Sequence, residues 1–291
     1  MQLLKKRIGF ILAVILYGTI GMLLRFVDLP SEAVALYRGL IGAAFILLFQ
    51  LVRRKLPEWS AIKKNLVWLL LSGVGLGLNW IFLFAAYVNT TVAIASLCNY
   101  MAPIFVIILT PFVLKEKLDP RKLPCIAAAF IGIVLVSGVI GGKVGSPAGI
   151  LFGLLGACCF TGIVFCNRRM QGISATDRAL MQLLLSAATI FPYMLIHNGG
   201  RIPFPTDLRS GLIVLTLGIV QTGLAYCLYF AGMAALPIQS VAILGYLEPI
   251  VSILCSVIFL SEPMDAFGWI GAVLVLGAAI VSEILPEKRE G

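Results

Sequence analysis

Long apolar stretches recur along almost the whole chain of 291 residues, separated by short segments that hold most of the charge. A run of about 18 or more apolar residues is long enough to cross the hydrocarbon core of a bilayer as a helix. We therefore expect an all-α membrane protein of ten transmembrane helices. The predicted spans lie at about 8–26, 33–51, 66–87, 91–114, 122–140, 147–166, 178–196, 210–231, 237–260 and 265–284.

The second half of the chain repeats part of the first half. With an offset of 146 residues, 12 of the 46 positions in 74–119 are identical to their partners, without a gap. Duplication of one unit explains this similarity, and it predicts two five-helix repeats, at 8–140 and 147–284. The copies differ at an informative position, because Ala102 aligns with Glu248.

Lys and Arg residues are concentrated in alternate predicted loops. If the N-terminus lies in the cytoplasm, cytoplasmic segments hold 17 of the 22 Lys and Arg residues, including those at 53–64 and 115–122. Positive charge marks cytoplasmic loops, so we expect both termini in the cytoplasm and a place in the cell inner (plasma) membrane. Five helices per repeat then turn the second repeat upside down relative to the first, as in many secondary transporters.

The overall charge and the cysteines do not indicate a nucleic-acid or metal partner. The net charge of +9 does not call for nucleic acid, because the excess of positive charge in cytoplasmic loops accounts for it. The seven cysteines lie inside apolar runs without the spacing of zinc ligands, so we expect them to pack as small apolar residues. The five aspartates are scattered, and no glycine-rich phosphate loop is present. We predict no catalytic residue, metal or cofactor, and no enzyme activity.

Glu248 is the one acidic residue near the middle of a predicted span. A charge at the bilayer centre costs about 2.5–3.5 kcal/mol on insertion scales, so this side chain should face a cavity or a partner, or be protonated. We interpret Glu248 as a transport residue that loads a proton on one side and releases it on the other. The alternative is a structural carboxyl group that stabilises the kink at Pro249.

Arg38 lies about one and a half turns inside the outer end of the second predicted span. Two interpretations are equally open at this stage. Its side chain either snorkels to the outer headgroups, or it lines the mouth of a cavity or pairs with Glu248.

Further polar and aromatic side chains inside the spans are candidates for the lining of a cavity. Trp80 and Tyr226 occupy matching repeat positions, and so do Tyr100 and Tyr246. Because buried amides need partners, repeat-matched aromatic residues beside mid-span amides favour a shared central cavity over packing or an interface belt. The candidates are Asn79, Trp80, Asn99, Tyr100, Gln182, Gln221, Tyr226 and Tyr246.

The order of these features resembles the EamA domain of the drug/metabolite transporter superfamily. Tyr-Leu-Glu-Pro occupies 246–249, Leu-Ser-Glu-Pro-Met-Asp occupies 260–265, a Gly-rich helix follows, and a weaker copy spans 100–119. Arg38, within Leu-Tyr-Arg-Gly, resembles the second-helix arginine of the family. The resemblance implies a ten-helix secondary carrier that works by alternating access. Here Ala102 replaces the usual acidic residue of the first half, so any role of that carboxylate rests on Glu248 alone.

The expected function is transport of a small polar organic solute, an amino acid or related metabolite, with export as the favoured direction. The expected partners are this solute, protons and the lipid bilayer. The alternatives are a metabolite importer of the same family and, in a different class, a membrane-embedded enzyme or scaffold. The sequence leaves the oligomeric state open, and a monomer is compatible with it.

Overall fold

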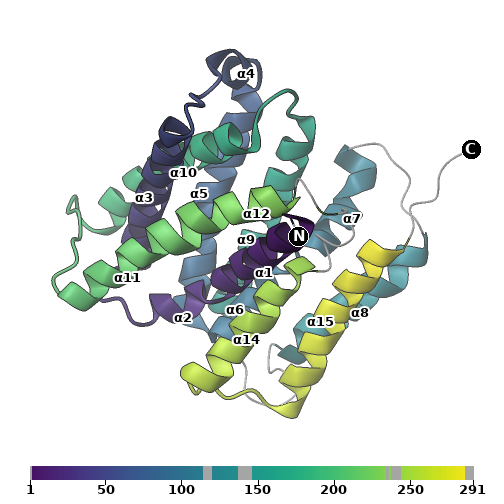
Figure 1. Cartoon of the computed structure of the whole chain (residues 1–291). Coiled ribbons are helices and arrows are strands. Elements are labelled where there is room, and N and C mark those ends of the chain that lie inside the picture. The colour runs from purple at the N-terminus through teal and green to yellow at the C-terminus, as the bar shows by residue number, and fades with distance from the viewer. Residues whose placement is uncertain (1, 114–119, 137–145, 234–235, 237–243, 286–291) are drawn as a thin grey trace, which may run out of the picture.

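The structure is a computed structural model that describes residues 2–113, 120–136, 146–233, 236 and 244–285. Helices form all of the regular elements in these ranges, and no strand occurs there (Figure 1). The expectation of an all-α, multi-pass membrane protein is confirmed. Among the described residues, seven helical segments are long and apolar enough to cross a membrane: Leu4–Leu24, Ser31–Val52, Leu66–Asn89, Val92–Val113, Pro147–Arg169, Ala175–His197 and Leu208–Gly232.

The helices follow one another with short connections. The first half contains α1 (Gln2–Gly18), α2 (Ile20–Leu24), α3 (Ser31–Val52), α4 (Trp59–Lys64), α5 (Leu66–Asn89), α6 (Val92–Asn99), α7 (Ala102–Val113) and α8 (Leu123–Val136). The second half contains α9 (Pro147–Arg169), α10 (Ala175–His197), α11 (Leu208–Gly218), the π-helix η2 (Ile219–Leu224), α12 (Ala225–Met233), α14 (Leu247–Phe259) and α15 (Ala266–Ile284).

Parts of two predicted spans and of one predicted loop lie outside the described residues. The predicted fifth span ends within 137–145, the ninth span begins within 237–243, and the basic inner loop includes 114–119. The described parts of the fifth, ninth and tenth spans are the shorter helices α8, α14 and α15. The count of ten spans and the inverted orientation of the halves therefore stay predictions.

Two helices are broken at matching positions of the repeat. α6 ends at Asn99 and α7 begins at Ala102, while α14 begins at Leu247, directly after a turn at Tyr246. Pro103 and Pro249 lie in the first turn that follows each break, where the missing backbone N–H of proline is tolerated. A helix that restarts inside the membrane exposes helix ends to the interior, and discontinuous helices of this kind form the sites of many transporters.

Small residues allow the helices to approach each other closely. Where α8 crosses α15, a Cβ atom added at Gly132 would lie 2.8 Å from the backbone oxygen of Gly271, which is too close for any other residue. Close contact through glycine is typical of helices that associate within lipid.

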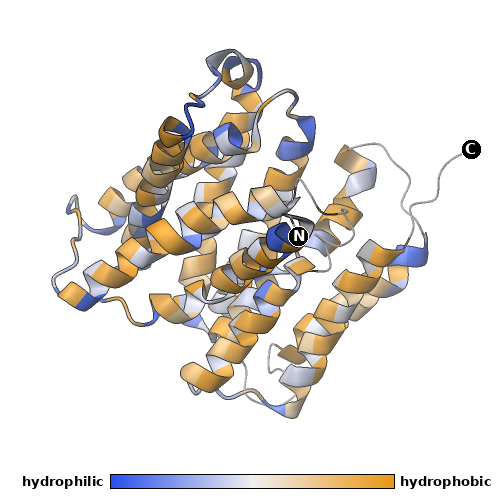
Figure 2. Cartoon of the chain, viewed as in Figure 1, coloured by the Kyte–Doolittle hydropathy of each residue, from blue (hydrophilic) through white to orange (hydrophobic). Residues whose placement is uncertain are grey.

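Hydrophobic residues make up most of the length of the helices (Figure 2), and many of them are exposed on the outside of the protein. Leu48, Ile196 and Phe259 are 59%, 83% and 65% exposed. Hydrophilic residues gather mainly at helix ends and in the connecting segments (Figure 2). An apolar exterior on this scale suits contact with lipid rather than with water.

Candidate transport site

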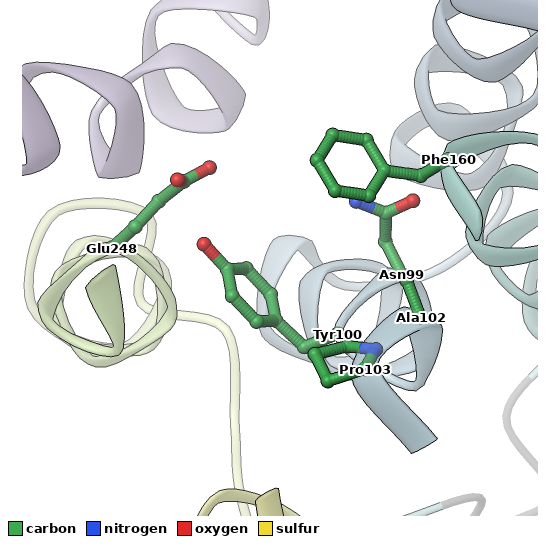
Figure 3. A pocket seen from close by; sticks show the side chains of 6 residues that line it. All are labelled: Asn99, Tyr100, Ala102, Pro103, Phe160 and Glu248. Atoms are coloured by element: carbon green, nitrogen blue, oxygen red, sulfur yellow. The ribbon is translucent and has the colours of Figure 1, made fainter. Parts of the chain in front are cut away.

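A pocket of about 110 Å³ lies at the break between α6 and α7, facing the first turn of α14. Figure 3 shows its lining from three parts of the chain: the α6–α7 break, α9 and α14. The pocket thus combines one charged, two polar and three apolar side chains. The lining residues are Asn99, Tyr100, Ala102, Pro103, Phe160 and Glu248.

Glu248 presents its carboxyl group to this pocket, opposite the hydroxyl group of Tyr100 (Figure 3). It lies in the first turn of α14, where the partial positive charge of a helix N-terminus favours a carboxylate. Within the described part of the chain, Glu248 forms no ion pair. Its charge is therefore balanced by the helix end, the tyrosine hydroxyl and the more distant Arg38, with which it interacts electrostatically.

Arg38 lies inside the protein and does not snorkel to the membrane surface. Its side chain is 5% exposed, its Nε–H donates a 2.7 Å hydrogen bond to Oγ1 of Thr222, and its guanidinium lies 4.3 Å from the centre of the Trp80 ring. Cation–π contacts of this kind gain strength when they are desolvated. The structure thus favours the interior position of Arg38 and places the predicted Trp80 directly against it.

Thr222 is a contact of Arg38 that sequence analysis missed. It lies in η2, the π-helical segment, where its hydroxyl group also donates a 2.8 Å hydrogen bond to the backbone oxygen of Leu217. α3 approaches closely here, because a Cβ atom added at Gly42 would lie 2.4 Å from Cγ2 of Thr222. π-helical turns inside α-helices are frequent at functional sites. No local sequence pattern predicts this π-helical turn.

A cluster of tyrosines lies near the two charged side chains. Tyr17 packs edge-on against Tyr226 and tilted against Tyr229, with ring centres 5.9 Å apart in both pairs. Tyr17 and Tyr226 each interact electrostatically with both Arg38 and Glu248. Tyr226 was a candidate from sequence. Tyr17 was missed, because its position in the first span gives no repeat-matched partner.

Two predicted amides hold one wall of the pocket. The Nδ2 group of Asn79 donates hydrogen bonds to Oδ1 of Asn99, at 3.1 Å, and to the backbone oxygen of Gly156, at 2.9 Å. A Cβ atom at Gly156 would lie only 3.0 Å from Oδ1 of Asn99. Asn99 is thus positioned from behind by α5 and α9, while its side chain lines the pocket (Figure 3).

Seven of the ten predicted residues are not in the lining of this pocket. Four of them, Arg38, Asn79, Trp80 and Tyr226, make the contacts described above, and the other three lie in different surroundings. Gln182 belongs to a separate buried cluster, in which its Nε2 donates to Oγ of Ser72 at 2.8 Å and to Oδ1 of Asn167 at 2.7 Å. Gln221 is buried in η2, and its Oε1 has no hydrogen-bond partner in the described ranges. Tyr246 is buried at the start of α14 and is not a lining residue of the pocket.

The apolar helices, the helix breaks and the buried charged centre together define a multi-pass membrane protein with an internal polar site. Comparison with known protein families identifies the family of this chain. The model of the EamA-like transporter family matches residues 5–138 and 147–283. The chain belongs to the EamA-like transporter family, which confirms the resemblance seen in the sequence and indicates a transporter rather than an enzyme.

Several similar proteins are named as transporters or efflux pumps. The uncharacterized transporter YxxF of Bacillus subtilis is 27% identical over 293 residues, which cover 98% of this chain and 90% of the relative. A probable amino-acid metabolite efflux pump of Salmonella typhimurium is 26% identical and covers 96% of this chain and 95% of its own. The corresponding Escherichia coli pump is 28% identical over 71% of this chain and 74% of its own.

A solved structure, titled "Crystal structure of protein", has the same fold. It superposes with a TM-score of 0.66 over 95% of this chain and 96% of its own, at 21% sequence identity. At this level of identity the likeness concerns the fold alone.

Proposed function

We propose that this protein is a secondary active transporter that moves an amino acid or a related metabolite across the inner membrane by alternating access, in the direction of export. The observation that carries the proposal is the position of Glu248 at a break in a membrane helix, where it interacts electrostatically with the buried Arg38. Charged groups inside a membrane protein mark the paths of solutes and ions. The curated names of the two efflux pumps support the same solute class and direction.

The two charges fit a solute that carries both signs. The ammonium group of an amino acid would replace the missing counter-charge of Glu248, and its carboxylate would complement Arg38, whose guanidinium matches carboxylates in shape. The pocket of about 110 Å³ holds about four water molecules. It therefore accommodates the polar head of such a solute, and Phe160 at its edge offers contact for an apolar side chain.

Glu248 also offers a way to couple transport to protons. A carboxylate without a counter-charge inside the membrane is costly, so it is most stable when neutralised by a proton or by the solute's ammonium group. The two then compete for one carboxylate. A carrier that binds either of them, and turns only when one is bound, exchanges protons for solute.

The matching breaks at Tyr100 and Tyr246 support an inverted repeat. In this arrangement both termini are cytoplasmic, and the pseudo-two-fold axis lies in the plane of the membrane. Residues 8–140 and 147–284 then form the two repeats, related by a half-turn.

Thiol labelling tests this orientation. Single cysteines at Ser146 and Thr206 should react with a membrane-impermeant reagent added outside, whereas a cysteine at Ser60 should react only after the membrane is opened. These sites precede α9, precede α11 and lie in α4. Labelling of Ser60→Cys and Thr206→Cys from the same side would overturn the orientation.

Selectivity of transport tests the function. Purified protein in liposomes should move at least one neutral amino acid, and the amine and the carboxylic acid that lack one of its two charges should compete poorly. The expected loss is large, because each missing partner leaves a buried charge unpaired. If the singly charged analogues competed as well as the neutral amino acid, the site would not recognise both charges, and the proposal would be contradicted.

A further inference from the structure

A second group of polar contacts lies at the far ends of α6 and α14, beyond the pocket. Glu262 follows α14, and its carboxylate accepts hydrogen bonds from the guanidinium of Arg25 at 2.8 Å and from the backbone N–H of Val92 at 2.8 Å. Arg25 also donates to the backbone oxygen of Thr90 at 2.7 Å. One carboxylate thus joins the residue after α2 and the start of α6 to the end of α14.

These contacts continue along the helices toward the pocket. The hydroxyl group of Ser256 donates to Glu262 and accepts a 3.3 Å hydrogen bond from the backbone N–H of Ala93. One turn further in, the hydroxyl groups of Ser96 and Ser252 lie 2.6 Å apart. Ser96, Ser252 and Ser256 are all buried. The result is a ladder of polar contacts between the facing sides of α6 and α14.

The ladder leads directly into the site. Ser252 and Ser256 are four and eight residues after Glu248, and Ser96 is four residues before Tyr100. Residues four apart share one face of a helix, so the ladder and the pocket lie along the same seam. Beyond the pocket, α7 packs against α9. The seam between α6 and α14 therefore covers the pocket from the end that the topology predicts to be outside.

We infer that this ladder, Arg25–Glu262 with Ser96–Ser252, is the outer gate of the transport path, closed in this structure. The inference rests on the proposed function, because a gate is required only in a transporter whose site opens alternately to the two sides of the membrane. Several properties suit a contact that opens and closes. The Arg25 and Glu262 side chains are 32% and 15% exposed, so water can take over their hydrogen bonds. The serine hydroxyl groups can likewise bind water when the helices separate.

A reversible crosslink tests the gate. Ser96→Cys and Ser252→Cys are introduced together into a cysteine-free background that transports like the parent. Oxidation should stop transport, and reduction should restore it, while each single variant should transport in both conditions. Full transport with the disulfide demonstrated by mass spectrometry would overturn the gate. If the parent background itself moves no solute, the proposed function fails instead, so the two failures are distinguishable.

Access to the pocket from outside gives a second readout. A cysteine at Ala102, which lines the pocket, should react several-fold faster with an external impermeant reagent when Glu262→Gln weakens the ladder. The matched control is Glu32→Gln. Glu32 is paired with His197 at 2.8 Å, but this pair joins α3 to α10 and not α6 to α14. An unchanged rate in Glu262→Gln, or an equal rise in Glu32→Gln, would overturn the gate.

Discussion

Replacing Glu248 with glutamine should abolish proton-driven accumulation of solute in proteoliposomes, while exchange of solute across the membrane continues at higher solute concentrations because the ammonium group loses its charged partner. Glutamine has nearly the same shape but cannot carry a proton or a charge, so the competition between proton and ammonium ends. The fold should persist, because Glu248 forms no ion pair within the described residues and removing its charge relieves a cost of burial. Uptake against the gradient and exchange at equilibrium are measured on the same preparation.

A matched variant separates a local effect from a general one. Glu58→Gln removes an exposed carboxyl group at the start of α4, far along the chain from the pocket, and it should accumulate solute like the parent. If Glu248→Gln accumulates solute like the parent, Glu248 is not the coupling residue. If Glu248→Gln fails to fold while Glu58→Gln folds, the carboxyl group belongs to the kink at Pro249, the structural alternative.

Replacing Arg38 with glutamine should weaken solute binding by about ten- to hundredfold, because a charged hydrogen bond contributes about 1.5–3 kcal/mol. Arg38→Lys should also be impaired, since lysine keeps the charge but loses the planar group that stacks on Trp80 and bonds to Thr222. The measurement is the concentration dependence of exchange. Expression and thermal stability are recorded alongside.

The control for Arg38 is an arginine at the opposite end of the same helix, α3. Arg53 follows α3 and stacks on the Phe49 ring at 4.7 Å, but it is exposed and remote from the pocket. Arg53→Gln should leave the concentration dependence of exchange unchanged. Parent-like exchange in both Arg38→Gln and Arg38→Lys would show that Arg38 takes no part in binding the solute.

The sequence predicted the helices well because every helix that crosses a lipid bilayer needs a long apolar stretch. Apolar length alone locates α3, α5, α9 and α10 within a few residues. The tight hairpin at Asn89–Thr90 follows from the gap between two apolar runs. The breaks after Asn99 and before Leu247 were less visible, since proline indicated a kink at one of them without fixing where each helix restarts.

The site could be predicted only in part, because its contacts depend on which helix faces meet. Glu248, Tyr100 and Asn99, all candidates from the sequence, line one pocket, whereas Tyr246, the repeat partner of Tyr100, does not. Gln182 lies in another cluster, although both it and Arg38 are polar residues about two turns into the second helix of their repeats. The contact between Arg38 and Thr222 requires a π-helical turn and the glycine at position 42, and no local pattern announces either.

Counterflow tests alternating access by a carrier most directly. Liposomes that contain the parent protein are loaded with an excess of an unlabelled neutral amino acid and diluted into a trace of the same labelled compound. A carrier that turns with one solute at a time should draw labelled solute inside above its equilibrium level for a short time, and then lose it. Labelled solute that only equilibrates, with no transient excess for any amino acid that the protein conducts, would contradict the account.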